Sequence, residues 1–235
     1  MEINWLDSSL PFLAFLDEWY EQLPNEALNT LIDDPNRIAV ISVDVINGFC
    51  YEGPLSSPRV KKIIDPITDL LNRVWEAGVR EIVLTQDTHE VDAVEFGQYP
   101  PHCIRGTSEA ETVPEIEALP FYNHMTIIEK NSIHSVLNTE LSDWISDHPG
   151  IDRFIIVGDC TDLCTYQLAM HLRLDANARQ LDRKIIVPVD CVDTYDLPVQ
   201  IAQDIGAIPH DGDLLHRVFL YSMMLNGVEI YAKII

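Results

Sequence analysis

The chain alternates between short apolar runs and segments in which apolar residues return every three to four positions. The runs are rich in β-branched residues, which favours strands, and the intervening spacing favours helices. We expect strands over 37–45, 81–85, 126–129, 152–157, 184–189 and 228–235, and helices over 58–77, 137–147, 162–178, 197–205 and 213–226. Strands that are apolar throughout and alternate with helices indicate a sheet covered on both faces. The pattern predicts one three-layer α/β/α domain with a mostly parallel sheet.

The first 36 residues precede the alternating strands and helices and form a separate N-terminal segment. Apolar residues at 13, 16, 19, 20 and 23 recur at helical spacing, and Pro24 interrupts them. We therefore divide the chain into a helical extension, 1–36, and an enzyme-like domain, 37–235. The extension is expected to act either as a cap on the domain or as a contact between subunits.

Charge narrows the classes of partner. The 235 residues carry 38 acidic against 15 basic side chains, a formal net charge of −23, with 47% hydrophobic residues. Such a surface repels nucleic-acid backbones and anionic membranes, so we expect no nucleic-acid or membrane partner and a small neutral or cationic substrate. No apolar run approaches the roughly 20 residues that span a bilayer.

Cellular location follows from the chain's start and its cysteines. The segment Met1–Tyr20 lacks the basic residues that open a signal peptide. Five cysteines, an odd number with no zinc-type pair, indicate free thiols in a reducing compartment. The cytoplasm is the expected location.

Reactive side chains follow four of the predicted strands. Asp44 ends the first, Asp87 and His89 follow the second, Lys130 follows the third, and Cys164 comes shortly after the fourth. Ligands of open parallel sheets bind at the carboxyl ends of the strands, so these groups should converge. The stretch 86–121 is too long for an ordinary connection, which indicates a functional loop.

Cys164 is the best candidate nucleophile. If Asp162 caps the following helix, Cys164 lies in its first turn, where free N–H groups and the helix dipole favour a thiolate and can bind an oxyanion. Lys130 would lower the thiol pKa further, and Asp44 would take the proton and return it to a leaving amine. The alternative is a structural cysteine beside an Asp44–Lys130 ion pair.

The remaining cysteines have weaker claims. Cys160 is expected to be a small packing residue, and Cys191 has no obvious base. Cys50 and Cys103 lie in predicted loops, where either could be an exposed thiol. None of the four stands at the start of a predicted helix.

A second group of polar residues has the composition of a metal site. Asp87 and His89 lie two residues apart just after a strand, and Glu95 and His102 follow in the long loop. Two histidines with one or two carboxylates suit Zn²⁺, Fe²⁺ or Mn²⁺ with positions left open. The alternative is a set of ordinary loop histidines in an acidic protein.

Several of these motifs together resemble those of nicotinamidases, which belong to the isochorismatase-like cysteine hydrolases. The resemblance runs from about residue 38 to residue 189. It rests on D-V-I-N-G-F-C at 44–50, D-T-H at 87–89, Y-P-P-H-C-I-R-G-T-S at 99–108, Lys130, and T-D-L-C at 161–164. The P-P-H-C segment with an upstream D-x-H is the most specific part.

The resemblance implies a six-stranded, mostly parallel sheet and assigns roles to the polar residues. It implies a triad of Asp44, Lys130 and Cys164, a divalent metal (Zn, Fe or Mn), an oxyanion site, and aromatic walls for the substrate. It places the metal on Asp87, His89 and His102, with Glu95 at a variable fourth position. It places the oxyanion on the N–H groups of Cys160 and Cys164, after a cis peptide bond before Cys160. The aromatic walls would be Phe49 and Tyr99. The two aromatic residues could equally be hydrophobic loop anchors.

The implied reaction is the hydrolysis of nicotinamide, a step of NAD metabolism, to nicotinate and ammonia by a homo-oligomer. Two positions depart from the family: Ile46 stands where a residue such as Gln is usual, and Gly48 where an acid is common. A related metal-independent enzyme for a carbamoyl, ureido or aliphatic amide is therefore an alternative. A non-catalytic scaffold that uses the N-terminal extension as its partner surface is another.

Overall fold

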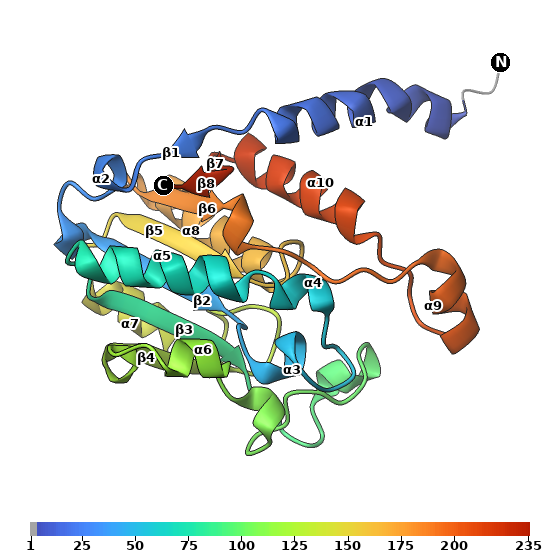
Figure 1. Ribbon diagram of the computed structural model, residues 1–235, viewed down its shortest axis with the longest axis horizontal. Coiled ribbons are helices and arrows are strands. Elements are labelled where there is room, and N and C mark those ends of the chain that lie inside the picture. Colours follow the sequence, from blue (N-terminus) through green and yellow to red (C-terminus); the bar gives the residue numbers. More distant parts are fainter. Residues whose placement is uncertain (1–3) are drawn as a thin grey trace.

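Six parallel strands form the centre of the molecule in the computed structural model, which describes residues 4–235 (Figure 1). Their spatial order is β4-β3-β2-β5-β6-β7, and every neighbouring pair is parallel. The strands are β2 (Ile38–Val43), β3 (Glu81–Asp87), β4 (Thr126–Lys130), β5 (Arg153–Gly158), β6 (Lys184–Pro188) and β7 (Glu229–Tyr231). The predicted fold class, with its six strands, is confirmed.

Helices cover both faces of this sheet, as its apolar strands require. Successive residues of β2 point to opposite faces: Val40 packs with α5, and Ile41 packs with α8 and α10. The first layer contains α3 (Asn47–Cys50), α4 (Pro58–Lys61), α5 (Ile64–Glu76) and α6 (Pro114–Glu117). The second contains α7 (Leu141–Asp147), α8 (Cys164–Arg179) and α10 (Gly212–Leu225).

Three predicted elements are shorter than their sequence patterns. The helix expected over 58–77 is split into α4 and α5, because Pro66 has no N–H to bond the carbonyl of Lys62. The helix expected over 137–147 begins only at Leu141, after Asn138 takes a left-handed φ of 56°. The last strand breaks after β7, and its final residues form β8 (Lys233–Ile234).

The N-terminal extension runs along the edge of the domain. It comprises α1 (Trp5–Glu21), β1 (Asn25–Glu26), α2 (Leu28–Leu31) and the 3-10 turn η1 (Pro35–Arg37); its first three residues lie outside the described part. β1 pairs in parallel with β8, and the second half of α1 packs on α10 (Figure 1). The extension is thus attached to the C-terminal part of the domain. Between residues 4 and 235, no helix has the length and apolarity needed to cross a bilayer.

Candidate active site

Four adjacent strands deliver the candidate residues to one edge of the sheet. Asp44 directly follows β2, Asp87 ends β3, Lys130 ends β4, and Cys164 opens α8 after β5. β5 approaches β2 closely at Gly158, where a Cβ would lie 2.0 Å from the Val43 carbonyl oxygen. Only glycine fits there, also because its φ is 113°. The convergence predicted from the strand ends is therefore present.

Lys130 lies at the centre of this cluster. Its Nζ is 2.8 Å from Asp44 Oδ2 and 3.7 Å from Cys164 Sγ, and it also donates to Asp87 Oδ1. All four side chains are buried. Burial alone would lower the Lys130 pKa, but the carboxylates of Asp44 and Asp87 raise it well above its usual range. The amine therefore stays an ammonium, and it holds the acid and the thiol within reach of each other.

Burial also sets the protonation of the other two groups. It raises the pKa of the Asp44 carboxyl to about 7, against the opposing charge of Lys130. It raises the pKa of the Cys164 thiol well above its usual range, because Lys130 offsets only part of the effect and Asp44 and Asp87 add to it. This direction is opposite to the lowered thiol pKa that the helix start and Lys130 led us to expect, so the reaction needs a neighbouring base to take the proton of the sulfur.

The turn before α8 is held differently from the prediction. Leu163 occupies the cap position and makes no side-chain cap, so the predicted role of Asp162 is wrong. The Asp162 Oδ2 lies 2.8 Å from His210 Nε2, and Thr161 Oγ1 lies 2.8 Å from His216 Nδ1. Two histidines from the C-terminal part therefore hold consecutive residues of the nucleophile turn.

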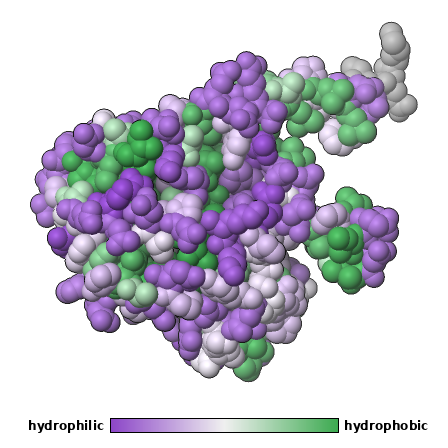
Figure 2. Space-filling view, viewed as in Figure 1, coloured by the Kyte–Doolittle hydropathy of each residue, from purple (hydrophilic) through white to green (hydrophobic). Residues whose placement is uncertain are grey.

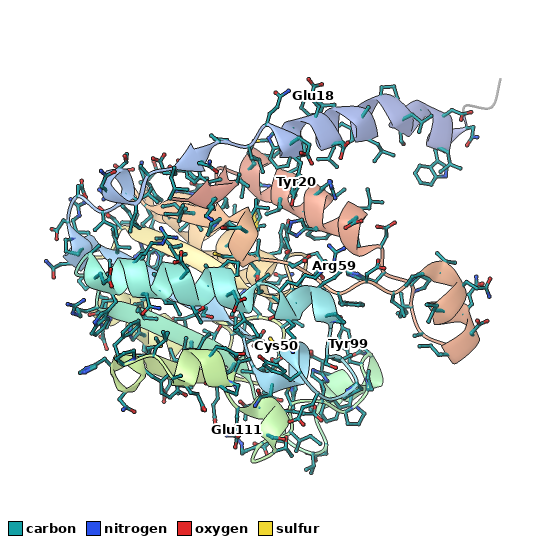
Figure 3. The ribbon with its side chains drawn as sticks, in the orientation of Figure 1. Glu18, Tyr20, Cys50, Arg59, Tyr99 and Glu111 are labelled. Atoms are coloured by element: carbon teal, nitrogen blue, oxygen red, sulfur yellow. The ribbon has the colours of Figure 1, made fainter. Side chains whose placement is uncertain are left out.

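The N-terminal extension reaches the same turn through one of these histidines. Tyr20 of α1, labelled in Figure 3, places its hydroxyl 3.3 Å from His216 Nε2. Burial lowers the pKa of His216 to about 4, so its ring is neutral and links the hydroxyls of Tyr20 and Thr161. The extension is therefore connected to the nucleophile turn through His216.

The backbone of this turn leaves two donors free. The Asp159–Cys160 peptide bond is cis, as the resemblance implied. Among residues 4–235, the backbone N–H groups of Cys160 and Cys164 have no backbone hydrogen-bond acceptor. The N–H groups of Leu163 and Thr165, in contrast, donate to the Cys160 carbonyl oxygen. Free donors of this kind can bind an oxyanion.

Asp87, His89 and His102 form a compact group beside the triad. Their ligand atoms lie within 4.8 Å of one another, and all three side chains are buried. His89 Nδ1 lies 2.8 Å from Asn131 Oδ1, and His102 Nδ1 lies 2.8 Å from the Pro100 carbonyl oxygen. Both rings therefore donate through Nδ1 and turn Nε2 toward Asp87 Oδ2, 3.6 and 3.9 Å away. Against the effect of burial, the Asp87 carboxylate raises the pKa of His89.

These residues fit a small divalent cation. Burial lowers the pKa of His102, which favours the neutral, ligating ring. The buried Nε2 of His89 has no hydrogen-bond partner among the described residues, and a metal would satisfy it. A carboxylate and two imidazoles suit Zn²⁺, Fe²⁺ or Mn²⁺.

The other predicted site residues lie around this group. Glu95, in the turn η2 (Val94–Gly97), is not one of the three clustered ligands; burial and the Asp87 charge raise its pKa. Its role as a fourth ligand stays a prediction. The rings of Phe49 and Tyr99 lie 5.8 and 6.2 Å from that of His102 (Figure 3 labels Tyr99). Two aromatic side chains thus flank one candidate ligand.

Sequence reasoning missed three contributors and misplaced two cysteines. Asn131, which orients His89, directly follows Lys130, so its place at a strand end was a usable signal. His210 and His216 lie about 50 residues beyond the turn that they hold, and no local pattern connects them to it. Cys50 and Cys103 are buried, which corrects the expectation of an exposed thiol.

Comparisons with known proteins find similar sequences over most of the chain. The family described as "Isochorismatase domain" matches residues 38–202. Nicotinamidase 1 of Arabidopsis thaliana is 28% identical over 243 aligned residues, covering 94% of this chain and 96% of the relative. The nicotinamidase/pyrazinamidase of Mycobacterium tuberculosis is 29% identical and covers 56% of this chain and 76% of its own length.

Solved structures show the same fold at lower identity. The pyrazinamidase of Pyrococcus horikoshii in complex with zinc superposes with a TM-score of 0.65 and 24% identity, covering 83% of this chain and 98% of that one. The N-carbamoylsarcosine amidase of Thermoplasma acidophilum does so with a TM-score of 0.61 and 22% identity, covering 83% and 95%.

Proposed function

The chain belongs to the isochorismatase family and is a hydrolase of amide bonds, and from this membership we propose that its substrate is nicotinamide or a close heteroaromatic amide. The products would be the acid, nicotinate, and ammonia. The observation that carries the proposal is the Asp87, His89 and His102 group directly beside the Cys164 cluster. An enzyme for aliphatic amides has no need of a metal next to its nucleophile.

In the proposed reaction Cys164 attacks the amide carbon while Asp44 takes the thiol proton. Lys130 keeps the two groups in place, and the N–H groups of Cys160 and Cys164 hold the oxyanion. As the C–N bond breaks, Asp44 gives its proton to the nitrogen, and ammonia leaves a thioester on Cys164. Water then attacks the thioester with Asp44 as base, which releases the acid and restores the thiol.

Substrate positioning is assigned to the residues of the long loop and α3. Asp87, His89 and His102, with Glu95 as the proposed fourth group, would hold a divalent ion that serves as a Lewis acid for the ring nitrogen. Phe49 and Tyr99 would stack on the two faces of the ring and orient its amide toward the sulfur. We further propose a cytoplasmic enzyme of NAD metabolism that acts as a homo-oligomer.

A small amide panel tests this function. We expect release of ammonia from nicotinamide to be fastest, to fall at least about tenfold after chelation, and to recover with Zn²⁺, Mn²⁺ or Fe²⁺. The control compounds are an aliphatic amide and an N-carbamoyl amino acid. Turnover of either control that ignores the chelator would instead identify the metal-independent relative, and a complete lack of turnover would favour a scaffold.

The rate should follow the protonation of Asp44. Its pKa of about 7 means that the base is ionised above neutrality and protonated below it. We therefore expect kcat/KM to fall with pH below about 7, approaching a tenfold loss per pH unit. Measurement of kcat/KM between pH 5 and 9 checks this, and a flat profile over pH 5–8 would contradict Asp44 as the base.

A further inference from the structure

Two parts of the chain project from the body of the molecule on the same side. The N-terminal arm, residues 5–15, is the first part of α1, and the α9 arm, residues 198–209, contains α9 (Val199–Ile205). Figure 1 shows both extending beyond the sheet and its helices, and Figure 2 shows hydrophobic surface on each with open space between them.

The N-terminal arm carries an apolar stripe that its own chain leaves uncovered. Leu6, Leu10 and Leu13 follow one another at i, i+4 and i+7, so they lie on one face of the helix. All three are exposed, Leu10 at 59%. The next turn on that face carries Asp17, whose carboxylate lies 3.5 Å from Arg217 of α10. The stripe therefore extends outward from a docked part of the same helix face.

The α9 arm presents a second uncovered surface. Ile201 and Ile205 are one helical turn apart and exposed, and Ile208 follows at 80% exposure. In the same helix Ala202 is fully buried, so α9 is docked on one side only.

Both arms are held in place at their roots. Leu197 and His210 exchange two backbone hydrogen bonds of 2.7 and 2.9 Å below the α9 arm. Rings of Phe12, Phe15 and Trp19 pack on Tyr221 at the base of the N-terminal arm. An element fixed in its extended position loses little conformational entropy when a partner binds it.

Charge excludes two classes of partner for the arms. Neither 4–21 nor 198–211 contains a lysine or arginine, while each contains acidic residues. Helices that bind anionic membranes carry basic residues on their polar face, and nucleic-acid contacts also require them. The apolar surface therefore points to a protein partner.

We propose that this partner is a second copy of the chain, with the arms of the two copies interlocking across a two-fold axis; this inference rests on the homo-oligomer proposed above and assigns its interface. Isologous pairing needs one self-complementary surface, and two apolar arms separated by open space provide it. The arms expose ten large apolar side chains, three of which are aromatic. A standard interface buries about 800 Å² per partner, and side chains of this number and size can form its apolar centre.

Sedimentation velocity of the full-length protein tests the proposal. We expect the wild-type chain to be a dimer at micromolar concentration, and Leu10→Asp and Ile205→Asp each to raise the dimer dissociation constant at least about tenfold. The matched control is Leu174→Asp, a leucine of α8 that is 49% exposed. It adds the same charge outside the arms and should leave the dimer unchanged.

Salt gives a second and independent readout on the unmodified protein. Each copy carries a net charge of −23, so screening should reduce repulsion and tighten an apolar dimer as NaCl increases. A wild-type chain that stays monomeric at 100 µM, about a hundred times a dissociation constant of 1 µM, would overturn the proposal. So would a dimer that salt weakens, or one that both arm variants leave intact.

Discussion

Replacing Cys164 with alanine should reduce amide hydrolysis by about 10⁴-fold or more, because the residue supplies the sulfur that forms the covalent intermediate. The fold should persist, and so should the metal proposed on Asp87, His89 and His102, because that group does not include the thiol. Initial rates of ammonia release, circular dichroism and the metal content per chain measure the three quantities separately.

Cys191→Ala is the matched control for this variant. Cys191 is as buried as Cys164, but it lies in the hydrophobic core and its thiol hydrogen-bonds the Asp190 carboxylate. We expect it to cost about 1 kcal/mol of stability and to leave the rate within a few-fold of wild type. Retained hydrolysis in Cys164→Ala would contradict the nucleophile assignment, and an equal loss in both variants would indicate a structural effect.

The sheet and the convergence of polar groups could be predicted because both follow from local patterns. An apolar β-branched run predicts a buried strand, and parallel strands deliver the residues after them to one edge. Asp44, Asp87 and Lys130 therefore had to lie close together once their strands were adjacent. The order of the strands placed Cys164 beside them, although the spacing alone did not fix that order.

Burial and long-range contacts limited what could be predicted. Asp162 looked like a helix cap because it precedes a helical pattern, yet its carboxylate pairs with His210, 48 residues later. Cys164 looked like a thiolate because of its helix and Lys130, yet desolvation has the larger influence on its pKa. Both errors came from interactions that depend on tertiary packing, which a local pattern does not contain.

Asp87 is the residue whose loss should affect most properties at once, because its two oxygens serve different groups. Oδ1 accepts from Lys130, and Oδ2 faces the ligating nitrogens of His89 and His102. We expect Asp87→Asn to lose most of its metal and at least about 10³-fold in kcat/KM. It should also lose about 2 kcal/mol of stability, since a buried ammonium loses one of two carboxylates. Metal analysis, kinetics and denaturant unfolding measure these effects.

Two comparisons separate the roles of Asp87. Glu129→Gln removes an exposed carboxylate from the adjacent strand together with its surface ion pair to Arg105. It should leave metal content and kcat/KM unchanged and cost at most about 1 kcal/mol of stability. His102→Ala removes a proposed metal ligand but leaves the Lys130 contacts intact, so it should mainly raise KM, with a smaller change in kcat. The Asp87 charge helps to raise the Asp44 pKa. The residual activity of Asp87→Asn should therefore persist to a lower pH than that of wild type before it falls. An Asp87→Asn protein with wild-type metal content and an unshifted pH profile would show that this carboxylate neither binds the metal nor influences Asp44.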